Sequence, residues 1–164
     1  MQLDDRDLKI LSVLQTEGRI TKTELAARVN LSPAPCWERL KKLEDAGVIE
    51  GYGARISAKI LGPQSFIFMQ AEIASHRAED FDHFEQAVQN IPQIVECWAV
   101  GGGIDYILKI VCKDVDSYQR LVDEMLEANI GLRRYHTYVV TKPVKSASGL
   151  SLEGLMGQGK TEGG

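Results

Sequence analysis

The sequence predicts an α+β protein of two parts, an N-terminal winged helix-turn-helix joined to a βαββαβ ferredoxin-like domain. Three short helical patterns fill residues 4–46, and strand-like and helix-like segments alternate from residue 65 onward. Between them, Leu61-Gly62-Pro63 interrupts regular structure. A chain of 164 residues has room for two small domains of this kind.

The first two helices are defined by their caps. Asp4 or Asp5 can begin a helix in which leucines recur at positions 8, 11 and 14, and Gly18 ends it. Thr21-Lys22-Thr23-Glu24 is a capping box that begins a second, short helix.

A third helix follows after the four-residue turn 29–32. Ser32 is the expected cap, Pro33 occupies the first helical position, and Gly47 is a helix stop. The apolar stripe of this helix consists of Cys36, Leu40 and Leu43. A short helix, a four-residue turn and a helix with basic outer positions are typical of a helix-turn-helix.

Glycine-punctuated, β-like sequence occupies residues 48–56 and predicts a wing that continues into a connecting strand. The expected boundaries are therefore 1–52 for the winged helix-turn-helix, 53–63 for a linker strand, 64–145 for the βαββαβ domain and 146–164 for a flexible, Gly/Ser-rich tail. Leucines and a methionine within the tail leave open a short docked segment.

The second part should contain strands at 65–73, 94–100, 105–112 and 133–141, with helices at 79–90 and 115–126. Both helices would cover one face of the sheet. Apolar residues in strand 105–112 nevertheless point to both faces, since Ile107 and Val111 alternate with Leu108 and Ile110. An uncovered apolar face predicts a homo-oligomer.

Composition and charge exclude several classes. The N-terminus is acidic and no apolar run is long enough to span a bilayer, so neither a signal peptide nor a membrane segment is expected. Three widely spaced cysteines predict a reduced, cytoplasmic protein. Residues 1–60 carry ten Lys/Arg against nine Asp/Glu, whereas residues 61–164 carry nine against fourteen, which favours local contact with double-stranded DNA over bulk electrostatic binding.

Several strings, in this order, resemble the Lrp/AsnC (feast/famine) transcription regulators across residues 3–145. They are Gly18-Arg19-Ile20-Thr21, Leu31-Ser32-Pro33-Ala34-Pro35-Cys36, Arg39-Leu40-Lys41-Lys42-Leu43-Glu44, Gly47-Val48-Ile49, Gly51-Tyr52, Asp105-Tyr106 and Thr137-Tyr138-Val139-Val140. The resemblance implies an ACT/RAM-type second domain that binds a small effector, usually an amino acid, and assembles dimers into larger rings, with an octamer as the family expectation.

The third helix is the expected recognition helix. Residues near its start would meet base edges, and its basic residues would hold phosphates. The alternative is a solvated basic face on a structural three-helix unit. The DNA-binding candidates are Ser32, Ala34, Pro35, Glu38, Arg39, Lys41 and Lys42.

The glycine turn 101–103 is either a tight hairpin or part of an effector pocket in which bare backbone grips the charged ends of an amino acid. Asp105 would pair with an ammonium group or hold the loop in shape. The resemblance places the effector at Ala99, Gly102, Gly103, Asp105, Val115, Tyr138, Val139 and Val140. Many family members have an acidic residue and an aromatic residue where this chain has Gly103 and Ile104. This departure would alter or abolish the response to the effector.

No constellation of catalytic, metal-ligating or cofactor-binding residues stands out, so the chain is not expected to be an enzyme. Two alternatives to an effector-responsive regulator remain. One is an effector-blind architectural protein that bridges DNA, and the other is an enzyme or regulatory subunit that borrowed an amino-acid-binding domain.

Overall fold

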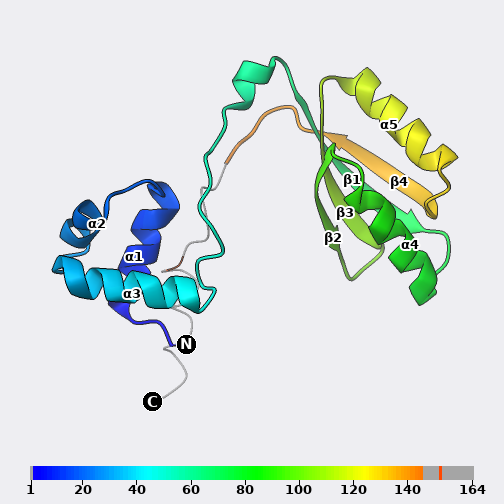
Figure 1. The fold of residues 1–164 in the computed structure, drawn as a ribbon. Helices are drawn as coiled ribbons and strands as arrows, with labels where there is room; N and C mark the ends of the chain where they lie inside the picture. Colours follow the sequence, from blue (N-terminus) through cyan, green and yellow to red (C-terminus); the bar gives the residue numbers. More distant parts are fainter. Residues whose placement is uncertain (1, 146–151, 153–164) are drawn as a thin grey trace. The chain divides into compact units, whose positions relative to one another are not determined.

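The computed structural model describes residues 2–145 and residue 152, which fall into two compact units (Figure 1). Unit 1 combines Met1–Arg55 with Lys145–Gly164, and unit 2 is Ile56–Val144. The division after Arg55 lies inside the expected linker 53–63. Apart from Leu152, the expected flexible tail 146–164 lies outside the described residues.

Unit 1 contains α1 (Asp5–Thr16), α2 (Lys22–Arg28) and α3 (Pro33–Asp45). Asp4 and Thr21 each begin a helix with a reciprocal capping box, as the sequence predicts for Thr21. Between α2 and α3 the chain turns at Asn30, whose φ of 54° is left-handed and suits asparagine. The helix-turn-helix is thereby confirmed.

The three helices enclose a small apolar core. Ile10, Leu25 and Leu43 are at most 1% exposed and pack together from one helix each. The predicted stripe of α3 is confirmed, because Cys36 and Leu40 are buried beside Leu43.

The β-strands expected for the wing and the linker are not formed in the single chain. Residues 46–64 contain no strand, and their only regular element is the short 3-10 helix η1 (Ala58–Leu61). A strand requires a neighbour to accept and donate its backbone hydrogen bonds. The described part of this chain supplies no such neighbour to residues 48–57, so these residues form no strand despite their β-like sequence.

Unit 2 has the predicted order of elements. It consists of β1 (Ser65–Ile73), α4 (Ala78–Gln89), β2 (Ile94–Ala99), β3 (Tyr106–Cys112), α5 (Val115–Glu127) and β4 (Leu132–Val139). The strands form one antiparallel sheet in the order β2-β3-β1-β4. This arrangement confirms the ferredoxin-like split βαββαβ unit.

Alternation along the strands gives the sheet two different faces. Ile67, Met69 and Ala71 point into a core that α4 and α5 cover together (Figure 1). On the other face, aromatic side chains remain 37–52% exposed; they are Phe66, Phe68, Trp98 and Tyr138. The register places these side chains with Glu96, Ile107, Lys109 and Val111. This set of residues is called the open face below.

Candidate DNA-binding surface and effector site

The outward side of α3 is polar and accessible. Ala34, Pro35, Glu38, Lys41 and Lys42 are all exposed, while the opposite side of the helix is buried. Two lysines against one glutamate give this surface a net positive charge. A helix with this pattern, placed second in a helix-turn-helix, can enter a major groove and contact phosphates beside it.

Ser32 occupies the predicted cap position but makes no side-chain cap hydrogen bond. A capping serine accepts from the second or third helical N–H, and the third position here is Pro35, which has no N–H. Ser32 is exposed at a helix N-terminus, where the N–H of Ala34 and the helix dipole favour a phosphate. Ser32 thus suits a phosphate contact better than a structural cap.

Arg39 does not point outward as a base-contacting residue would. Its Nη1 donates to Oδ2 of Asp4 at 2.7 Å and to Oδ1 of Asp7 at 2.8 Å. Both acids belong to the start of α1, and Asp7 is only 4% exposed. Hydrogen bonds to these two carboxylates raise the pKa of Arg39, and a backbone bond from Asp7 together with Arg39 lowers that of Asp4. Arg39 was expected among the DNA-binding residues; in this structure its guanidinium joins α3 to the start of α1 instead, because both carboxylates lie within its reach.

Trp37, on the exposed side of α3, lies against α2. The ammonium of Lys22 is 3.0 Å from the centre of the indole ring. Since Lys22 is the first residue of α2, this cation–π contact ties the beginning of α2 to α3. Trp37 accordingly belongs to the packing of the motif.

In unit 2, Asp105 organises the predicted effector loop. Its Oδ2 accepts the backbone N–H of Ile73 at 2.8 Å, and its Oδ1 lies 3.2 Å from Nε2 of His76. Its own backbone N–H donates to the carbonyl of Ala71. Of the three glycines in the turn, Gly102 alone has a left-handed φ, at 144°. Asp105 therefore holds the loop against the end of β1, one of the two roles expected for it.

A hollow of about 130 Å³ opens beside this loop. Its polar lining brings two carboxylates, from Glu72 and Asp105, together with the guanidinium of Arg133 and the imidazole of His76. Glycines 102 and 103 contribute bare backbone, and a Cβ at either would meet open space. A small zwitterion carries charges of both signs, which this lining can match.

The eight predicted effector residues are not brought together in one chain. Ala99 pairs with Tyr106, so Ala99, Gly102, Gly103 and Asp105 lie at the end of the sheet where β1 finishes. Val139 pairs with Ile67, and Val140 donates to the carbonyl of Phe66, so Val115, Tyr138, Val139 and Val140 lie at the opposite end. The four residue-to-residue steps from Ile67 to Ala71 separate the groups by about 13 Å along the strand.

Comparison with known proteins agrees with this architecture. The sequence model described as "Winged helix-turn-helix DNA-binding" matches residues 3–50, and that of the "Lrp/AsnC ligand binding domain" matches residues 67–150. The chain belongs to the Lrp/AsnC family. It is a transcriptional regulator with a DNA-binding helix-turn-helix and a ligand-binding domain.

Lrp/AsnC relatives match over nearly the whole chain. The transcriptional regulatory protein DoeX of Halomonas elongata is 51% identical over 148 residues, which are 90% of this chain and 94% of DoeX. The leucine-responsive regulatory protein of Escherichia coli K12 is 38% identical over 92% of each chain. Among solved structures, a transcriptional regulator of Neisseria meningitidis in complex with L-Met has a TM-score of 0.87 at 34% identity, covering 94% of this chain and 99% of that one.

Three residues of this Lrp/AsnC chain that surround the loop were not predicted from the sequence as effector contacts: Glu72, His76 and Arg133. The signal that could have found them is the topology, because antiparallel pairing brings the end of β1 and the start of β4 beside the start of β3.

The three cysteines carry unreactive thiols. Burial raises the pKa of the Cys36, Cys97 and Cys112 thiols, to about 11 for Cys97, so these thiols stay protonated near neutral pH.

Two further findings concern only the described residues. Within residues 2–145, no helix combines the length and the apolar character needed to cross a membrane. The same part of the chain contains no group of three or more His, Cys, Asp or Glu side chains placed to hold a metal ion.

Proposed function

We propose that this regulator recognises specific DNA sequences through α3 and that an amino acid controls its assembly and its DNA binding. The observation that carries the DNA-binding part is the exposed, net-positive outer side of α3. Lys41, Lys42 and the hydroxyl of Ser32 hold phosphates, while Ala34, Pro35 and Glu38 meet base edges. Arg39 is assigned to positioning α3, on the strength of its bonds to Asp4 and Asp7.

Glu38 provides the sharpest test of sequence recognition. A glutamate accepts a hydrogen bond from the N4 amino group of cytosine, whereas a glutamine both donates and accepts. Sites selected from random DNA by the wild type and by Glu38→Gln should differ at one base pair in each half-site. Binding to unrelated DNA should change little, and identical selected sites would exclude Glu38 from base recognition.

The effector is proposed to be an amino acid bound between copies of the chain. Two observations support this. The hollow beside Asp105 offers carboxylates and a guanidinium, and the other predicted effector residues lie about 13 Å away in the same chain. A second copy brings Val115 and Tyr138–Val140 to the loop of the first, which completes a site that one chain leaves in two parts. The L-Met complex of the Neisseria relative adds support for this class of ligand.

Assembly follows from the open face. We propose that two copies pair through their open faces and through residues 48–60, whose β-like sequence pairs with no strand among the described residues. Two recognition helices then address two half-sites of a near-palindrome. Dimers associate further, to the octamer that the family resemblance implies, and effector binding shifts that equilibrium or the spacing of the DNA-binding units.

The effector proposal is tested by a thermal-shift screen against the twenty amino acids. Wild type is compared with Asp105→Ala, which removes both roles of the side chain, and with Asp105→Asn, which keeps an oxygen to accept from Ile73 but loses the charge. A ligand that binds the folded state raises the melting temperature of the wild type, and its stabilising free energy grows with the logarithm of one plus the ratio of ligand concentration to Kd. Loss of that shift in both variants supports direct pairing with an ammonium group; loss in Asp105→Ala alone assigns Asp105 to loop shape.

The alternative is an effector-blind protein that bridges DNA. It predicts no thermal shift with any amino acid at millimolar concentration, together with compaction of DNA that carries several sites. That result would follow if Gly103 and Ile104, which replace the usual family residues, abolish the response to the effector.

We also propose that the chain is not an enzyme, and that it acts in the cytoplasm, where the DNA of its bacterial relatives lies.

A further inference from the structure

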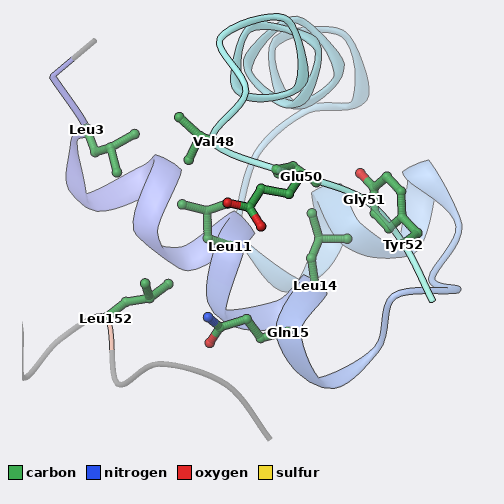
Figure 2. A pocket seen from close by; sticks show the side chains of 10 residues that line it. Leu3, Leu11, Leu14, Gln15, Val48, Glu50, Gly51, Tyr52 and Leu152 are labelled. Carbon is green, nitrogen blue, oxygen red and sulfur yellow. The ribbon is translucent and has the colours of Figure 1, made fainter. Parts of the chain in front are cut away.

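An apolar groove of about 510 Å³ runs along unit 1 between α1 and the segment 48–52 (Figure 2). Leu3, Leu11 and Leu14 form one wall, and Val48 and Ile49 belong to the other. Neither the surface of α3 nor the effector loop includes any of these residues. The groove is therefore separate from the DNA-binding surface and the effector hollow, although its wall 48–52 also belongs to the segment 48–60 that is proposed to pair between copies.

The second wall of the groove is fixed to the end of α3. The backbone N–H groups of Val48 and Ile49 both donate to the carbonyl of Leu43, at 3.0 and 3.3 Å. The hydroxyl of Tyr52 donates to Oε1 of Glu44 at 2.7 Å, and burial and this hydrogen bond raise the pKa of Tyr52 to about 12. Whatever occupies the groove thus contacts the segment that continues directly from the recognition helix.

The groove has an occupant. Leu152 lines it, is half-buried, and packs against the same core cluster as Leu11 and Leu43 (Figure 2). Leu152 belongs to the C-terminal segment Lys145–Gly164, which clusters with unit 1 although the preceding residues belong to unit 2. It lies just beyond residue 150, where the match to the family's ligand-binding domain ends.

We propose that this groove is the docking site of the chain's own C-terminal segment, anchored by Leu152. Leu152 lies 13 positions after Val139, the last residue of β4, and a stretch of this length reaches about 43 Å when extended. Leu152, which follows the ligand-binding unit in the sequence, therefore packs on the DNA-binding unit. Docking adds apolar contact to residues 48–52 and so stabilises the end of α3.

A disulfide trap identifies the occupant. Gln15 and Leu152 both line the groove, so Gln15→Cys with Leu152→Cys, in a Cys97→Ser background, should oxidise to a bond within one chain. The matched control pairs Gln15→Cys with Val144→Cys, since Val144 is 88% exposed and does not line the groove. Non-reducing denaturing electrophoresis separates the outcomes. The proposal is supported if only the first pair gives a monomer that migrates faster. It is overturned if no cross-link forms. It is also overturned if the first pair gives a covalent dimer, because a second copy then supplies the segment.

Hydrogen exchange tests the effect on α3 without any cross-link. Leu152→Asp should speed exchange of the Val48 and Ile49 amides by about fivefold, the factor that corresponds to about 1 kcal/mol. Leu152→Met should restore wild-type protection, and Val144→Asp should leave it unchanged. Equal exchange in Leu152→Asp and wild type would overturn the stabilising role. None of these measurements depends on DNA or effector, so the docking proposal stands or falls separately from the proposed function.

Discussion

The two units differ in how much of their functional site one chain completes. Unit 1 presents the whole outer side of α3, positioned by Arg39 and Trp37 from within the unit. Unit 2 divides its predicted effector residues between opposite ends of the sheet and leaves the open face exposed. A helix displays its side chains around one axis, whereas a sheet spreads neighbouring strand ends several residues apart. DNA contact is thus available to a single chain, and sensing is expected to belong to the assembly.

The largest expected effect is on assembly. Phe68 is exposed on the open face and is not part of the buried core of unit 2, so a polar residue is tolerated there in the single chain. Phe68→Asp should therefore fold but place a charge in the proposed interface. We expect the dimer dissociation constant to rise about 100-fold or more, measured by sedimentation.

Leu126→Asp is the control for that prediction, because Leu126 is similarly exposed but lies on α5. Loss of assembly in this control as well would mean that the open face is not the interface. If Phe68→Asp also loses any amino-acid thermal shift, sensing depends on assembly. A retained shift in the monomer would break the comparison between the two units.

The next effect concerns DNA. Lys41→Ala with Lys42→Ala removes two proposed phosphate contacts and should weaken DNA binding by about 10- to 100-fold at moderate salt. The slope of log affinity against log salt should become shallower by about two. Lys113→Ala with Lys142→Ala removes the same charge from exposed positions of unit 2. Fluorescence anisotropy over a series of salt concentrations measures the DNA affinity of each variant. If only the first pair weakens binding, the lysines of α3 contact DNA; if both pairs weaken it equally, the effect is due to net charge.

A smaller effect is expected on the stability of unit 1. Asp7→Ala removes one of the two carboxylates that accept from Arg39, and it also removes the acceptor for the backbone N–H of Asp4, a hydrogen bond of 3.1 Å. Such a loss should lower the free energy of unfolding by about 2 kcal/mol, measured in urea. Asp5→Ala is the matched control, since no hydrogen bond to its carboxylate is seen among the described residues. Equal stability of the two variants would contradict a positioning role for Arg39.

Local signals in the sequence were sufficient for most of the fold. The Thr21 capping box, the turn 29–32 and the order of strands and helices all depend on residues close together in the chain. Three features were not accessible in this way. The bonds from Arg39 to Asp4 and Asp7 join residues 35 and 32 positions apart, the division of the effector residues depends on strand register, and the strand expected at 53–63 lacks a neighbour in this chain.

The smallest expected effect is on the pH dependence of the stability of unit 1, to which the two helix capping boxes contribute. Hydrogen bonds at the two capping boxes lower the folded pKa of Asp4 and Glu24 below their ordinary values of 3.8 and 4.5. The unfolded chain therefore takes up these protons first, so their stabilising contribution is complete above about pH 5 and is lost as the pH falls through the folded values. Asn caps a helix as well as Asp, and Gln can replace Glu in a capping box, so Asp4→Asn with Glu24→Gln keeps the geometry without the titration.

Hydrogen exchange of peptides from α1 and from β1, measured between pH 6 and pH 3 and corrected for the intrinsic rate, reports each unit separately. In the wild type, protection of both should fall in acid, because the pKa values of Asp80 and Asp114 in unit 2 are also lowered by hydrogen bonds to their carboxylates. The double variant should flatten the curve for α1 and leave that for β1 unchanged. An unchanged α1 curve would mean that the two capping boxes do not set the acid stability of the DNA-binding unit.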